Sequence, residues 1–254
     1  MKRFLLQLAA AITFFTRIPL WRWVNIPSEY FSEIIYLWPL TGWITGGVTA
    51  LAWWGFSSVF PPMLAIILAL GTRTLLTGGL HEDGLGDFID GFGGGKNKDD
   101  ILRVMKDSHT GNYALIGMIF YYLITLNSLL SMPNELVGVM LLTADPLSKM
   151  CTAVMMNFLP YARTASESKS KMVFKKTDFV QFSFMIIAGL TPFCIFVKTT
   201  IWMAVIAPLI VVIIIKNYSH KKIGGYTGDI CGATALIAES SLYIFTLLIL
   251  RLMG

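Results

Sequence analysis

The sequence predicts an all-α protein, a polytopic membrane helix bundle of about seven transmembrane helices with an N-terminal interfacial helix. The 254-residue chain is 55% hydrophobic, and its mean hydropathy is +0.67. Only 14% of its residues are charged, whereas soluble domains carry about 25%. Several apolar runs also approach the roughly 20 residues that a helix needs to cross a bilayer. We therefore expect one integral membrane domain over residues 1–254.

The N-terminal segment has some features of a signal peptide. Lys2 and Arg3 precede an apolar stretch over residues 4–15, but Arg17 then interrupts it. No convincing small-residue cleavage site follows. We interpret the segment as a retained helix that lies in the interface or is partly inserted.

Seven apolar segments are the candidate spans. A short turn at 57–61 joins the first two, and Lys198 with its neighbours separates the fifth from the sixth, which predicts a tight hairpin there. The segments are residues 34–56, 62–80, 112–131, 136–159, 179–197, 200–215 and 232–250.

The distribution of Lys and Arg predicts the orientation. Threading the seven spans places the basic loops 81–111, 160–178 and 216–231 on the same side as the N-terminus. The short loops on the other side hold almost no Lys or Arg, so the positive-inside rule places the N-terminus and the polar loops in the cytoplasm. The formal net charge of +5 is explained by this rule and requires no nucleic-acid partner. The three cysteines form no CxxC pattern, so no disulfide framework or zinc site is expected.

The segment HEDGLGDFIDG contains the densest group of polar residues. Asp83, Asp87 and Asp90 stand at i, i+4 and i+7, so on a helix they share one face and repel one another. A divalent cation removes that repulsion, and Mg²⁺ prefers carboxylate oxygens together with waters or substrate phosphates. Glu82 points about 100° away from Asp83 and is a candidate second-shell or second-metal ligand. His81 is a candidate general base or electrophile.

An acidic helix start without bound metal is the alternative, since carboxylates are favourable near a helix N-terminus. The glycines argue against it, because Gly84, Gly86 and Gly91 each weaken a helix by about 1 kcal/mol relative to alanine. Glycine at these positions indicates the close approach of a ligand or of a neighbouring helix. The GxxxxGK[ST] spacing of a P-loop is absent.

Two further segments supply candidate substrate-binding residues. Residues 105–113, MKDSHTGNY, could form a second polar wall with cations for phosphate, or an ordinary juxtamembrane turn. Residues 224–233, GGYTGDICGA, open the last span, and a glycine-lined helix start can hold phosphate; a flexible loop is the alternative. The candidates in or next to these two segments are Arg103, Lys106, Asp107, Ser108, Thr227 and Asp229.

Four ionisable residues fall inside the predicted spans, where they are costly and should face the bundle interior. Asp145 and Lys149 are spaced i, i+4 and predict a mutual salt bridge. Glu239 has no local partner, so we expect it to meet a cation from another helix. Arg73 is the remaining member.

Taken together, these motifs resemble the cobalamin synthase family of adenosylcobinamide-GDP ribazoletransferases. The resemblance rests on TGGLHEDGLGDFIDG and MKDSHTGNYALIG, and extends to FFTRIP (14–19), WPLTGWITGG (38–47), PYAR and GGYTGDICGA. His109 and Lys149 stand where arginine is expected in many relatives.

The resemblance implies a prokaryotic plasma (inner) membrane enzyme that requires Mg²⁺. Its substrates would be adenosylcobinamide-GDP and α-ribazole or α-ribazole 5′-phosphate, and its products adenosylcobalamin (or its 5′-phosphate) and GMP. Asp83, Asp87 and Asp90 would hold the metal, and His81 or an aspartate would take the hydroxyl proton. Arg163, the arginine of PYAR (160–163), would join Arg103 and Lys106 as a candidate for contacts with phosphate or substrate. Apart from these substrates and the lipid bilayer no partner is implied, and a homo-oligomer is left open.

Two other functions fit part of the pattern. A CDP-alcohol phosphotransferase also uses aspartates on membrane helices, but its D-x₂-D-G-x₂-A-R motif does not match, because no Ala-Arg follows Asp87 or Asp90. A cation transporter would place its carboxylates at the bilayer midplane, often in two repeated halves. Here the cluster lies at a membrane edge and no repeat is evident.

Overall fold

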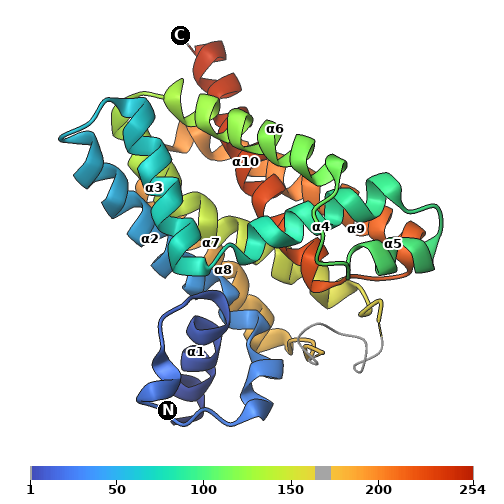
Figure 1. Cartoon of the computed structure of the whole chain (residues 1–254). Helices are drawn as coiled ribbons and strands as arrows, with labels where there is room; N and C mark the ends of the chain where they lie inside the picture. The colour runs from blue at the N-terminus through green and yellow to red at the C-terminus, as the bar shows by residue number, and fades with distance from the viewer. Residues whose placement is uncertain (1, 164–172, 254) are drawn as a thin grey trace.

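The computed structural model describes residues 2–163 and 173–253, and these residues form a bundle of helices (Figure 1). Within this part of the chain the one β-type pairing is an isolated parallel bridge between Tyr161 and Tyr226. The α-helices are α1 Lys2–Phe15, α2 Trp38–Ser57, α3 Pro62–Thr77, α4 Leu80–Gly94, α5 Lys98–Val104, α6 Asn112–Leu130, α7 Asn134–Phe158, α8 Phe179–Phe196, α9 Ile206–Ile223 and α10 Gly228–Met253. Short 3₁₀ helices are η1 Leu20–Arg22, η2 Ser28–Glu33, η3 Ile35–Leu37 and η4 Thr199–Val205.

The apolar helices make this a multi-pass membrane protein, but the count of seven spans is not confirmed. Among the described residues, five helical segments are long and apolar enough to cross a membrane: α6, α7, α8, η4 with α9, and α10. The bent pair α3 and α4 raises the number to six. The predicted first span is a helix, α2, but it does not join this group, since tryptophan, threonine and glycine dilute its apolar character.

Helix α7 is the centre of the bundle, and 83% of its most apolar window is buried. It packs most closely against α2. A Cβ added to Gly42 would lie 2.6 Å from the Cα of Pro146, and one added to Gly46 would lie 2.9 Å from the carbonyl oxygen of Leu141. These two glycines therefore allow the backbones of α2 and α7 to touch where Pro146 interrupts the hydrogen bonding of α7.

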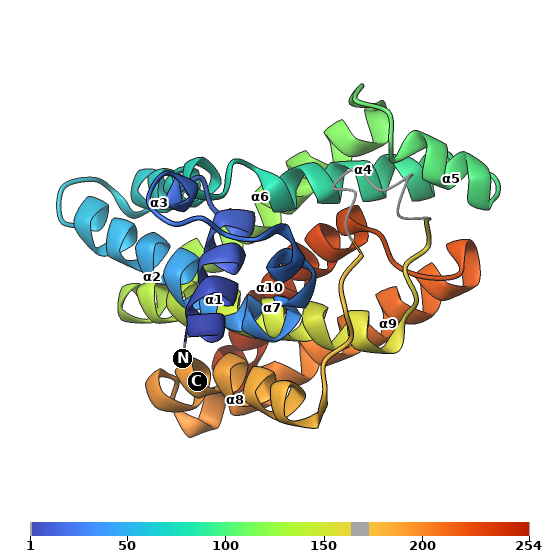
Figure 2. The same cartoon turned by 90° about the horizontal axis from the view of Figure 1, so that it is seen from below.

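The outer helices expose apolar side chains, as expected of a surface that faces lipid. Only 28% of the most apolar window is buried in α6, in α8 and in the η4–α9 segment. The predicted short connection between the fifth and sixth spans is present, since α8 ends at Phe196 and η4 begins at Thr199. The two helices do not form a closely packed hairpin, however, because α8 packs mainly on α7 and α9 mainly on α10 (Figure 2).

A sharp bend separates α3 from α4, and the two axes differ by 91°. In Figure 1, α4 turns away from the lower end of α3 toward the right of the bundle. Gly78 and Gly79 make this bend with φ values of 71° and 75°, a left-handed conformation that favours glycine. The backbone N–H of Arg17 donates to the carbonyl of Leu76 at 2.7 Å, and the Arg17 side chain occupies the space where a Cβ of Gly78 would lie. The chain after α1 therefore supports the bend.

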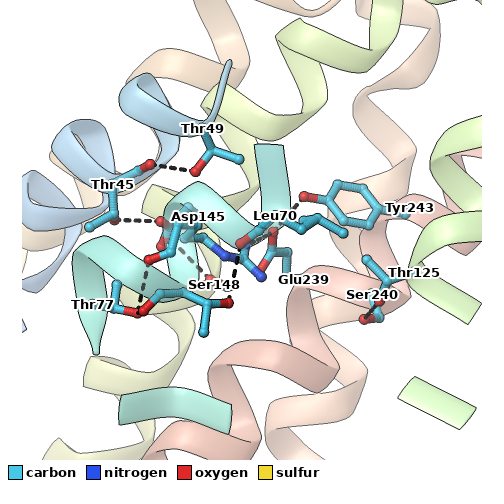
Figure 3. Close-up of polar contacts among 12 residues, drawn as sticks. Thr45, Thr49, Leu70, Thr77, Thr125, Asp145, Ser148, Glu239, Ser240 and Tyr243 are labelled. Carbon is cyan, nitrogen blue, oxygen red and sulfur yellow. Dashed lines mark hydrogen bonds and ion pairs between the residues drawn. The ribbon is translucent and has the colours of Figure 1, made fainter. Parts of the chain in front are cut away.

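The ionisable residues inside the bundle are paired, which confirms both sequence predictions. Arg73 of α3 donates to Glu239 of α10 at 2.6 Å, and their side chains are 7% and 4% exposed. Lys149 lies 2.7 Å from Asp145 on α7. Figure 3 shows that Asp145 and Glu239 belong to one polar region between helices, in which Thr45 of α2 donates to Asp145.

The N-terminal helix α1 is confirmed as a helix and is tied down by ion pairs at its start. Glu33 accepts from Arg3 at 2.7 Å and from Lys175 at 2.9 Å. These hydrogen bonds, first that of Arg3, lower the pKa of Glu33 to about 2. The stabilisation from Glu33 is therefore fully present above the ordinary carboxyl pKa near 4.5 and is lost as the pH falls through about 2.

Candidate active site

A cavity of about 170 Å³ lies where α1, α4, α7 and α10 meet. Four of the predicted site residues border it: His81, Asp83, Arg163 and Asp229. They come from three separate parts of the chain. The cavity therefore brings together two carboxylates, a histidine and a cation, which are groups that can move a proton and stabilise negative charge.

The bend between α3 and α4 determines how His81 and Asp83 reach the cavity. Because α4 begins directly after the two left-handed glycines, its first turn carries both residues. His81 is 8% exposed, and its ring centroid lies 5.6 Å from that of Phe15. Asp83 is exposed and borders the cavity. A straight continuation of α3 would carry these residues in a different direction.

Helices α4 and α10 cross at Gly84 and Gly232, two glycines that border the cavity. A Cβ on Gly84 would lie 2.9 Å from the carbonyl oxygen of Asp229, and a Cβ on Gly232 would lie 3.0 Å from that of His81. The sequence left two causes open for Gly84, the close approach of a ligand or that of a neighbouring helix. The structure shows the neighbouring helix, α10. The crossing fixes the spacing between Asp83 and Asp229.

We expect Gly84→Ala to lower the activity of this site, because its methyl group must push α10 away and separate the two walls of the cavity. Such overpacking costs about 1–3 kcal/mol. Gly55→Ala in α2 is the matched control, since nothing lies within 4 Å of its added Cβ. Turnover and thermal unfolding of both purified variants are the measurements. Equal activity of the two variants would contradict a role for the crossing in positioning the site.

A short pairing of two loops positions Arg163 and the start of α10. Tyr226 N donates to the carbonyl of Pro160 at 2.9 Å, and Ala162 N donates to that of Tyr226 at 2.8 Å. Arg163 follows this pairing, with its side chain 4% exposed and its Nη2 3.9 Å from Asp229. Its guanidinium also donates to the carbonyl of Leu102 at 3.0 Å, whereas its Nε has no acceptor in the described part of the chain.

Thr227 and Asp229 stand at the first turn of α10. The hydroxyl of Thr227 accepts from the backbone N–H of Ile230 at 3.3 Å, so Thr227 caps the helix. It also donates to the Asp229 carboxylate at 3.3 Å. Burial raises the pKa of the preceding Tyr226 hydroxyl, which therefore stays neutral. The predicted flexible-loop alternative for this segment is thus wrong, because the segment is a paired turn and a capped helix start.

The three aspartates of α4 have different surroundings. Asp90 accepts from the backbone N–H groups of Gly111 at 2.6 Å and Ala114 at 2.8 Å. Its carboxylate thus caps the start of α6, about 10 Å along the helix from Asp83. Asp87 lies one turn beyond Asp83. Across residues 2–163 and 173–253, no three His, Cys, Asp or Glu side chains are grouped as a ready metal site.

The donor set nevertheless fits Mg²⁺ in part. Mg²⁺ is usually held by one or two carboxylates and completes its shell with waters and substrate phosphates. Asp83 and Asp87 stand on successive turns of α4 and would suit that number, but of the two Asp83 alone borders the cavity. Asp90 is occupied by backbone hydrogen bonds. Glu82 points elsewhere: its Oε1 accepts from Thr74 at 3.2 Å, and it borders a second, water-sized cavity of about 10 Å³ with Arg73 and Glu239.

The predicted second polar wall lies away from the cavity. Arg103 pairs with Asp100 at 3.3 Å, and Asp107 accepts from the His109 ring at 2.7 Å and from its backbone N–H at 3.0 Å. These hydrogen bonds lower the pKa of Asp107. Lys106 and Ser108 are exposed on the same loop. None of these residues borders the cavity, so their role in substrate binding stays a prediction.

Two kinds of cavity residue were not predicted as site residues. Lys149 was interpreted as half of an ion pair and as a position where relatives carry arginine, but not as a site residue. It borders the cavity, with its ammonium 5.3 Å from the centre of the Phe15 ring. The aromatic residues Phe14, Trp38, Tyr161, Phe174 and Tyr226 border it as well. In a membrane protein aromatic residues are abundant, so no local pattern marks these.

Comparisons with known proteins find relatives that match most of the chain. The family model described as cobalamin-5-phosphate synthase matches residues 7–247. A Shewanella baltica protein named adenosylcobinamide-GDP ribazoletransferase is 33% identical, over 94% of this chain and 92% of its own length. A Leptospira biflexa protein of the same name is 31% identical, over 96% of this chain and 97% of its own length. No solved structure matches the chain.

Proposed function

The chain belongs to the cobalamin-5-phosphate synthase family, and we propose that it is a Mg²⁺-dependent adenosylcobinamide-GDP ribazoletransferase. Its substrates are then adenosylcobinamide-GDP and α-ribazole or α-ribazole 5′-phosphate. The observation that carries the proposal is the cavity in which His81, Asp83, Arg163 and Asp229 meet, within the matched region.

The proposed reaction is a displacement at phosphorus. The 3′-hydroxyl oxygen of the ribazole attacks the phosphorus next to the cobinamide arm and forms a new P–O bond. The bond from this phosphorus to the bridging oxygen breaks, and its electron pair leaves with GMP. The hydroxyl proton passes to Asp83 or His81, the two proton acceptors of α4 that border the cavity.

The cations of the cavity support a diphosphate in this position. Phosphoryl transfer depends mainly on positioning and on stabilisation of charge. The guanidinium of Arg163 is held by its neighbours and keeps its Nε unpartnered within the described residues, so it can orient a phosphate oxygen. Lys149 adds a second positive charge at the same cavity. Mg²⁺ bound by Asp83 and Asp87 would neutralise the charge of the diphosphate and of the departing GMP.

The experiment uses membrane vesicles that contain the protein, with adenosylcobinamide-GDP, α-ribazole phosphate and Mg²⁺. We expect adenosylcobalamin 5′-phosphate and GMP in equal amounts, loss of both with a chelator, and recovery when Mg²⁺ is restored. Activity that persists after complete removal of divalent cations would contradict the metal requirement. CDP-diacylglycerol with an alcohol, offered in parallel, should give no product; turnover of that pair would favour a CDP-alcohol phosphotransferase.

We further propose that the protein lies in the prokaryotic plasma (inner) membrane with its active site toward the cytoplasm. Vesicles of known sidedness test that orientation. The charged substrates do not cross a bilayer unaided, so inside-out vesicles should be active at once. Right-side-out vesicles should become active only after permeabilisation. The opposite result would reverse the orientation that the basic loops indicate.

A further inference from the structure

One side of the cavity is made of aromatic rings from three segments that are distant in sequence. Phe14 and Phe15 end α1, Trp38 begins α2, and Phe174 precedes α8. The ring centroids of Trp38 lie 4.9 Å from Phe15 and 5.5 Å from Phe174, and Phe14 lies 5.6 Å from Phe174. We call these four residues the aromatic wall. Trp38 and Phe15 are each 3% exposed, whereas Phe14 and Phe174 are partly open.

The aromatic wall contains a single N–H donor, the indole Nε1 of Trp38, and this donor has no acceptor in the described part of the chain. Two other indoles are satisfied: Trp43 donates to the carbonyl of Ala188 at 2.8 Å, and Trp202 to that of Val197 at 3.0 Å. Buried donors without a partner are rare, and each requires an explanation. A bound ligand that offers one hydrogen-bond acceptor to Trp38 Nε1 would explain this donor.

We infer that the aromatic wall holds the planar base of the nucleoside substrate, and that Trp38 Nε1 donates to its unsubstituted ring nitrogen. This inference rests on the proposed function. The base of α-ribazole is a benzimidazole, which has two fused rings that can stack on aromatic side chains. One of its nitrogens carries the ribose and the other is an acceptor, so it has no N–H donor of its own. The aromatic wall offers apolar ring surface and one donor, which matches that pattern.

The other two large groups of the substrates match less well. Guanine presents several donors and acceptors along one edge, and burial beside phenylalanine rings would leave most of them without partners. A corrin ring is far larger than the cavity, whose 170 Å³ is already below the roughly 300–1,000 Å³ typical of sites for drug-sized ligands. The aromatic wall therefore suits one bicyclic base.

The position of the aromatic wall also suits the reaction. The ring of Phe15 lies 5.6 Å from the ring of His81 and 5.3 Å from the ammonium of Lys149. A base stacked on the aromatic wall would thus leave its ribose beside the polar residues of α4 and α7. That places a ribose hydroxyl next to the proposed proton acceptors.

The test pairs a variant with a modified substrate. Trp38→Phe keeps an aromatic ring and removes the N–H. An indole riboside phosphate keeps the fused rings and replaces the acceptor nitrogen by C–H. We expect either change alone to weaken binding about tenfold, as expected for one hydrogen bond, and the two together to weaken it no further. Binding of each nucleoside to the purified protein is measured by calorimetry without the second substrate, so the outcome does not depend on turnover.

Trp43→Phe is the matched control, because it removes a satisfied indole of the same helix outside the cavity. It should leave the preference of the protein for the benzimidazole over the indole unchanged. Phe174→Leu is the second variant if Trp38→Phe does not fold; it should weaken the binding of both nucleosides while the binding of adenosylcobinamide-GDP stays the same. The inference is overturned if Trp38→Phe retains the preference for benzimidazole, or if Phe174→Leu weakens the binding of adenosylcobinamide-GDP instead.

If the variants behave as expected in binding and no cobamide is formed by the wild type, the base site stands and the proposed transfer fails. If cobamide is formed and the binding preference persists in Trp38→Phe, the transfer stands and the base site fails.

Discussion

Replacing Asp83 by asparagine is expected to lower turnover by a factor of about 10²–10⁴ while the protein still inserts into the membrane. Asparagine has the same shape, but its amide can neither accept the hydroxyl proton nor supply negative charge to Mg²⁺. Asp87→Asn should cause a loss of similar size if both carboxylates hold the metal. The measurement is GMP release by variants purified in equal amounts.

Two other carboxylates provide the comparison. Asp99→Asn changes an exposed residue of α5 and should leave turnover unaltered. Asp90→Ala should act mainly on stability, since it removes the cap of α6, and such losses cost about 0.5–2 kcal/mol. Wild-type turnover in both Asp83→Asn and Asp87→Asn would rule out the proposed roles of the two carboxylates.

The second large effect concerns stability. Glu239→Gln should destabilise the folded protein by about 3–5 kcal/mol, because it leaves the guanidinium of Arg73 buried without its counter-charge. Tyr243 and Tyr121 also lose part of their network, since Tyr243 donates to Glu239 at 2.5 Å and Arg73 donates to Tyr121 at 3.2 Å. Thermal unfolding in detergent is the measurement.

A double-mutant cycle separates the pair from its surroundings. The cycle compares Arg73→Met and Glu239→Leu, each alone and both combined. The double variant removes both charges and should recover most of the stability lost in either of these single variants, because no uncompensated charge remains. Glu33→Gln, at a solvent-accessible ion-pair network, should cost no more than about 1 kcal/mol. If the double variant is as unstable as the sum of the singles, the loss does not come from an unpaired buried charge.

Much of the bundle follows from local pattern. The helical spans, the start of α6 and the pairs formed by Asp145 and Glu239 were predictable, because hydropathy and the cost of buried charge act on each segment separately. The spacing of Asp83, Asp87 and Asp90 correctly predicts a helix. It does not predict that Asp90 serves α6, since that depends on where another helix begins.

The rest depends on contacts between segments far apart in the chain. Gly84 and Gly232 meet only because α3 bends into α4 and α10 crosses there. The bend itself could have been suspected from Gly78 and Gly79, but its direction is determined by tertiary packing. Likewise Phe14, Trp38 and Phe174 carry no signal individually, and become a recognisable surface only when three segments converge.

The cavity has a consequence for how the protein is made. The aromatic wall comes from the first 38 residues and from Phe174, and another side of the cavity comes from Gly228 and the residues of α10 that follow it. The two ends of the chain must therefore meet before the site exists. Because synthesis proceeds from the N-terminus, a ribosome-bound chain that has not yet released α10 has no enclosed site. Premature termination anywhere before α10 should therefore give a membrane-inserted but inactive product, and co-expressing the missing C-terminal helix as a separate peptide offers a way to restore it.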